Sequence, residues 1–90
     1  MRPKEHLAPS AFGAQPAGIN KTRSMMNLTM IGALGKMHEW EIHCKGAIGN
    51  GVTKDELRAI IHVIGIYCGV PQALECFRAA RSAMAEAGME

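Results

Sequence analysis

Residues 54–68 restrict the possible folds of this chain more than any other segment. They are predicted to form one helix, and that helix is apolar on two sides. Its first face carries apolar side chains at helical spacing: Leu57, Ile60, Ile61, Ile64 and Cys68. Its opposite face is also apolar: Ala59, Val63 and Ile66. A helix that is apolar nearly all round is buried nearly all round, and a chain of 90 residues cannot easily cover both faces. The sequence therefore predicts a homo-oligomer.

The start of this helix carries the clearest local signal in the chain. Thr53 and Glu56 stand three residues apart directly before the apolar run, which is the spacing of a capping box. We therefore place the N-cap at Thr53.

Three further helices are expected, over residues 20–34, 37–49 and 71–87. Asn20 is a suitable N-cap for the first and Gly35 a suitable stop, while Pro71 suits the first turn of the last. Gly32 would let another helix approach closely. Their expected inward faces are Met25, Leu28 and Ile31; then Trp40, Ala47 and Ile48; then Ala73, Phe77, Ala80 and Met84. The predicted class is all-α, with about four helices in hairpins and no competing strand pattern.

Residues 1–20 differ in composition from the rest of the chain. Prolines and glycines are scattered through them without a sustained apolar period. We expect an extended or partly disordered arm over 1–20 and a helical domain over 21–90.

Composition and charge argue against several classes of protein. The net charge of +2 is not concentrated in one run, so no nucleic-acid partner is expected. No apolar segment is long enough for a membrane span, and the N-terminus does not resemble a signal peptide. The three cysteines have no CxxC spacing and form neither a disulfide framework nor a zinc site. We expect a cytoplasmic protein without a metal site.

Polar residues at helical spacing provide candidate site residues. Lys36, Glu39 and His43 share one side of the second helix, His62 interrupts the most apolar helix, and Arg23 lies early in the first. Together they offer acid–base groups and cations for a small carboxylated substrate. Each also has a structural interpretation. Glu39 and His43 fit an ordinary surface pair, and His62 a buried hydrogen bond at an interface.

Four segments, taken in order, resemble the carboxymuconolactone decarboxylase family. They are Lys21–Leu28, Glu39–His43 with Ala47, Asn50–Thr53 with Glu56, and His62–Pro71. The resemblance covers about residues 16–87. It implies an all-α, alkylhydroperoxidase/carboxymuconolactone decarboxylase-like fold, commonly assembled as a trimer or hexamer.

The resemblance also implies a choice between two chemistries. Relatives of the alkylhydroperoxidase type carry a CxxC before the histidine, but Lys36 and Glu39 stand at those positions here, which argues against a thiol peroxidase. The other branch decarboxylates γ-carboxymuconolactone in aromatic catabolism without a cofactor. Carried over by position, His43, Glu39 and His62 would be catalytic, and Arg23 and Lys36 would bind substrate. Family members usually carry more N-terminal sequence, which forms helices that cover the pocket, and residues 1–20 do not resemble those helices. The alternative is therefore a non-catalytic oligomeric binding or scaffold protein of the same fold.

Overall fold

The computed structural model describes residues 17–89, and every regular element in this range is a helix. In chain order these are α2 (Ala17–Leu34), α3 (Met37–Gly49), α4 (Lys54–Cys68) and α5 (Val70–Glu86). The predicted all-α class with four helices is confirmed. The predicted arm falls mostly on residues 1–16, which lie outside the described range; α2 begins at Ala17, three residues before the predicted start.

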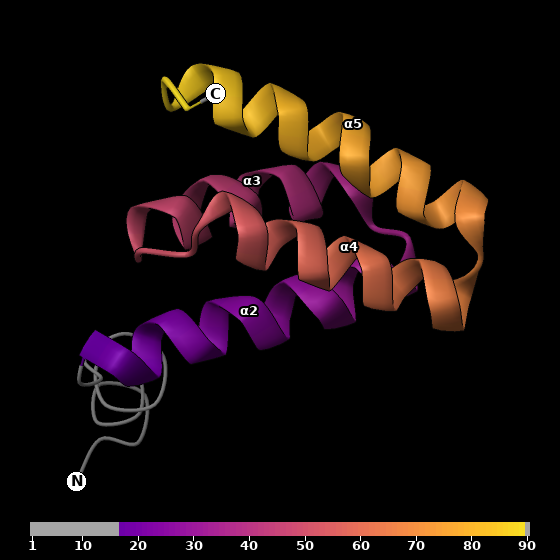
Figure 1. Ribbon diagram of the computed structural model, residues 1–90, viewed down its shortest axis with the longest axis horizontal. Helices are drawn as coiled ribbons and strands as arrows, with labels where there is room; N and C mark the ends of the chain where they lie inside the picture. Colours follow the sequence, from indigo (N-terminus) through magenta and orange to yellow (C-terminus); the bar gives the residue numbers. More distant parts are fainter. Residues whose placement is uncertain (1–16, 90) are drawn as a thin grey trace, which may run out of the picture.

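Successive helices run in opposite directions, with α2 along one edge of the molecule and α5 along the opposite edge (Figure 1). Between them lie α3 and α4, one behind the other in this view. Both α2 and α5 pack against α3 and α4, whereas α3 and α4 touch each other at most marginally. Side chains of α3 and α4 can therefore meet only where both point into the core that the four helices share.

The core lies where all four helices converge, and Trp40 is its largest member. The indole is fully buried, and its Nε1 donates a hydrogen bond of 2.8 Å to the carbonyl of Leu28. Gly32 lies against it: a Cβ there would come within 2.5 Å of Ile64 Cδ1 and 2.9 Å of Trp40 Nε1. The predicted close approach at Gly32 is confirmed. The buried apolar residues are Leu28, Trp40, Cys44, Ala47, Val52, Leu57, Ile60, Ile64, Cys76, Ala80 and Ala83.

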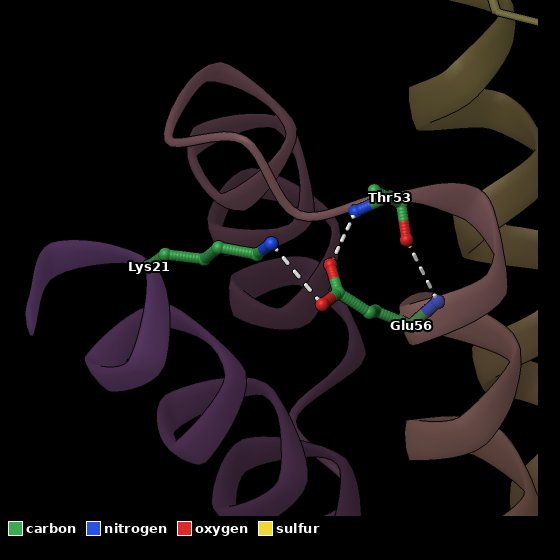
Figure 2. Close-up of polar contacts among 3 residues, drawn as sticks. All are labelled: Lys21, Thr53 and Glu56. Carbon is green, nitrogen blue, oxygen red and sulfur yellow. Dashed lines mark hydrogen bonds and ion pairs between the residues drawn. The ribbon is translucent and has the colours of Figure 1, made fainter. Parts of the chain in front are cut away.

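The capping box at the start of α4 is present as predicted. The Thr53 hydroxyl accepts from the Glu56 backbone N–H at 3.1 Å, and the Glu56 carboxylate accepts from the Thr53 N–H at 2.8 Å. The same carboxylate pairs with Lys21 of α2 at 3.1 Å (Figure 2). One side chain thus satisfies the start of α4 and joins it to α2.

Turns at positive φ separate the helices. Gly35, the predicted stop, has φ of 75° and ends α2, and Gly69 has φ of 100° between α4 and α5. Only glycine adopts these values without strain. The last helix starts at Val70, one residue before the predicted Pro71, so the proline lies in the first turn as expected.

Two predicted core positions are wrong. Phe77 is 49% exposed, and Cys68, at the last position of α4, is exposed as well. The inward face of α5 is Cys76, Ala80 and Ala83. It neighbours the predicted stripe on the helix surface: Ala80 belongs to both, and Cys76 and Ala83 take the places expected for Phe77 and Met84. These small side chains suit a helix that packs against the bulky Trp40 region. Periodicity alone does not separate two neighbouring stripes that share Ala80.

None of the described helices is both long and apolar enough to cross a membrane.

Candidate functional site

Helix α3 presents two different flanks beside its buried stripe. One flank faces α5, because Glu41 accepts a hydrogen bond of 3.0 Å from Ser82 and Lys45 pairs with Glu86 at 2.9 Å. These contacts fix the rotation of α3 about its own axis. They also leave the opposite flank directed toward the α2 side of the molecule.

The opposite flank carries three of the predicted site residues. Glu39 and His43 are four residues apart and lie in one row with Asn50, whose side chain donates to Ser24 of α2 at 2.9 Å. Lys36 is at the N-cap of α3, one turn before Glu39. All three predicted side chains are exposed. None of these three side chains has a hydrogen bond or ion pair to another residue of the described range 17–89.

Arg23 comes from the neighbouring helix. Its side chain is half-buried. Arg23 directly precedes Ser24, which accepts the hydrogen bond from Asn50, so it lies toward the C-terminal end of α3. His43 precedes Asn50 by seven residues, roughly 10 Å of helix. The structure therefore places Arg23 and the Lys36, Glu39 and His43 row on the same pair of helices, with Arg23 at the far end.

His62 stands apart from this group. It is exposed on α4 of the single chain, and the buried hydrogen bond expected for it at an interface stays a prediction. Its side chain lines a shallow groove with Ile66 of α4 and Val70 of α5. Because α3 and α4 hardly touch, His62 and His43 do not come together within one chain.

The sequence analysis did not predict a second candidate site, an apolar cavity with basic residues at its rim on the seam between α4 and α5. The floor of this cavity includes Ile61 and Phe77, and its rim carries Lys54 and Arg58. A wider space of about 440 Å³ adjoins it, shares Phe77 and Met84 with it, and is also lined by Arg81. The available signal was the spacing: Lys54–Arg58 and Phe77–Arg81 are both four residues apart, which places each pair on one helix face.

Two of the three free cysteines, Cys44 and Cys76, are buried in the core. Cys44 is fully buried in α3, and this burial, together with the Glu41 carboxylate and the Cys76 thiol, raises the pKa of its thiol to about 11. Burial likewise raises the pKa of Cys76. Thiolates are the reactive form, so both core cysteines are suited to packing. Across residues 17–89, no group of three His, Cys, Asp or Glu side chains could hold a metal ion.

Chemically, the α3 flank combines a carboxylate, an imidazole and an ammonium group, all open to a ligand. Imidazole and carboxylate groups are the commonest acids and bases in enzymes, and a nearby cation stabilises an anionic substrate or intermediate. This set is suited to moving a proton at a small organic anion.

Comparison with known proteins places the chain in a family. The sequence profile of the carboxymuconolactone decarboxylase family matches residues 11–82. A 4-carboxymuconolactone decarboxylase of Acinetobacter baylyi is 30% identical over 76 residues, which are 84% of this chain and 57% of the relative. A nitrosuccinic acid decarboxylase of Metarhizium robertsii is 36% identical over 61 residues, which are 68% of this chain and 43% of the relative.

The chain thus spans about half the length of the curated relatives it matches. No solved structure matches it significantly.

Proposed function

Because this chain belongs to the carboxymuconolactone decarboxylase family, we propose that it is a carboxy-lyase acting on γ-carboxymuconolactone or a related small carboxylated lactone, without a cofactor. The observation that carries the proposal is the open flank of α3, where the Glu39 and His43 side chains lie next to each other without partners in the described chain. Two relatives named as decarboxylases support the reaction class.

The substrates in those two names share a chemical property. In carboxymuconolactone, the bond to the departing carboxylate is next to a conjugated lactone; in nitrosuccinic acid it is next to a nitro group. Both neighbouring groups can accept the electron pair released when carbon dioxide leaves. The protein then has to hold the remaining carboxylate, stabilise the resulting anion and return one proton to carbon.

We assign these tasks to the predicted residues. Lys36 and Arg23 would contact carboxylate oxygens of the substrate as cations. His43, as the imidazolium, would deliver its proton to carbon and take up a new one from solvent, and the Glu39 carboxylate, one turn earlier on the same flank, would orient the imidazole. His62 would be a second imidazole, on the other side of the chain, and it would reach the same substrate only across a boundary between subunits.

The direct test incubates the purified protein with γ-carboxymuconolactone and, in parallel, with nitrosuccinate, and follows carbon dioxide release. We expect turnover of at least one of these substrates. His43→Ala should lower kcat by a factor of about 10² to 10⁴, the usual contribution of a general acid.

His38→Ala is the matched control, because His38 is also exposed on α3 but points from a different face. It should leave kcat unchanged. Turnover that is equal in the two variants would remove the role assigned to His43. If neither substrate is consumed above background, the lyase proposal fails, and the non-catalytic alternative is favoured.

A further inference from the structure

The α4–α5 seam carries a cavity that the proposed reaction does not use. Its floor is apolar and comes from both helices, chiefly Leu57 and Ile61 of α4 with Phe77 and Met84 of α5. It has two adjoining parts that share Phe77 and Met84, a smaller part of about 70 Å³ and a more open part of about 440 Å³. The open part falls in the size range of small-molecule sites in proteins.

Three cations surround this cavity. Lys54 and Arg58 project from the first turns of α4, and Arg81 from α5. The Arg81 guanidinium lies over the Phe77 ring, 6.0 Å from its centre, so the charge stands directly beside the apolar floor.

Two of these cations have no carboxylate partner among the described residues. Arg58 pairs with Asp55 at 3.3 Å, but neither Lys54 nor Arg81 forms an ion pair with any residue of 17–89. Among the other described cations, Lys21 pairs with Glu56 and Lys45 with Glu41 and Glu86, whereas Lys36 and Arg78 also form no ion pair. At the seam, two unpaired positive charges stand together at the mouth of an apolar cavity.

We propose that the seam between α4 and α5 is a binding site for an amphiphilic carboxylate, a small organic acid with one carboxylate and an apolar chain. The chain lies on Phe77, Ile61 and Met84, and the carboxylate faces Lys54 and Arg81. The site is separate from the Glu39 and His43 flank on α3, so the proposal does not depend on decarboxylation.

Two probes of equal chain length test the site, sodium octanoate and 1-octanol. Each is titrated into the ¹⁵N-labelled protein below its aggregation limit, and the backbone amide shifts of α4 and α5 are followed. We expect saturable shifts around Ile61, Phe77 and Met84, with octanoate binding more tightly than octanol. An equal affinity for the two probes, or no saturable shift, would overturn the proposal.

Arg81→Gln and Arg78→Gln separate a local contact from net charge. Both remove one positive charge from α5, but Arg78 does not line the cavity. Arg81→Gln should weaken octanoate about three- to fivefold, in the range of an exposed ion pair, and leave octanol unchanged. Arg78→Gln should bind both probes as the unchanged protein does. Equal losses in the two variants would contradict the assigned carboxylate contact.

Phe77→Ala should weaken both probes to a similar extent, because it removes the apolar floor and not the charge. Sedimentation velocity at the same protein concentration examines another occupant, a second copy of the chain. If Phe77→Ala dissociates an oligomer, and octanoate shows no saturable binding to the intact assembly, then the seam is a subunit contact and the proposal is wrong.

Discussion

Gly32 shows how much one missing side chain contributes to this fold. Its backbone lies so close to Trp40 and Ile64 that a Cβ would meet both side chains. The Ile64 contact involves the flexible end of a side chain, but the Trp40 indole is held by its hydrogen bond to Leu28. Helix α2 can approach the core at this distance only because position 32 is glycine.

Gly32→Ala is therefore expected to destabilise the protein by about 1–3 kcal/mol, the typical cost of overpacking a core. The gain in helix propensity, about 1 kcal/mol, offsets part of this cost. The measurement is urea unfolding at a fixed protein concentration. Gly46→Ala is the control, because a Cβ at position 46 meets nothing within 4 Å. It should be neutral or stabilising, and equal effects of the two substitutions would contradict the packing argument.

At the scale of the element, α4 begins with a carboxylate that has two functions. Glu56 accepts from the Thr53 backbone N–H and pairs with Lys21 of α2 (Figure 2). The hydrogen bond from Thr53, followed by Lys21, lowers the pKa of the Glu56 carboxyl. The capping box was predictable from four consecutive residues, whereas the ion pair to α2 was not.

The lowered pKa makes this contribution to stability dependent on pH. An unfolded glutamate takes up its proton at about pH 4.3, and folded Glu56 does so at lower pH. Between the two values the unfolded state binds more protons, so this contribution is present above about pH 4.3 and is lost as the pH falls through the folded pKa.

Glu56→Gln should consequently reduce stability at pH 7 and have a smaller effect at acidic pH, below the folded pKa. Urea unfolding of both proteins across this range checks the expectation. Asp55→Asn is the matched control, since Asp55 is a neighbouring carboxylate that makes only an exposed pair with Arg58. Its effect should be small at every pH. A Glu56→Gln effect that does not change with pH would contradict the linkage.

At the scale of the whole molecule, the outer side of the four-helix arrangement remains apolar. Val63 and Ile66 on α4 are 41% and 61% exposed, and Met26 and Met30 on α2 are 64% and 56% exposed. The structure thus shows the second apolar side of α4 uncovered in a single chain, as the sequence led us to expect. We propose that copies of the chain cover these side chains in a homo-oligomer, such as a trimer or hexamer.

Ile66→Glu should shift this assembly toward smaller species, because a buried unpaired carboxylate is costly at an interface. Helix content should stay the same, since Ile66 points away from the core of its own chain. Analytical ultracentrifugation with circular dichroism measures both quantities. His38→Glu adds a similar charge at an exposed position of α3 and should not change the mass. A monomeric unchanged protein would contradict the proposal directly.

The features predicted correctly depend on residues close together in the sequence. The helices, the Thr53 cap and the stop at Gly35 follow from hydrogen bonds and backbone preferences that span about four residues. The side of α5 that faces the core, by contrast, depends on the shape of the neighbouring Trp40 region, and for this reason the inward position predicted for Phe77 is wrong.

The candidate site divides in the same way. Spacing along one helix predicts that Lys36, Glu39 and His43 lie together, and in the fold they share one flank of α3. Whether His62 joins them, and where Lys54 meets Arg81, depends on which helices are neighbours. Helices α2 and α5 each pack against both α3 and α4, and that arrangement separates the two histidines and forms the cavity on the α4–α5 seam. Contacts between residues distant in sequence form only when whole helical faces are buried together, and local spacing carries no information about them.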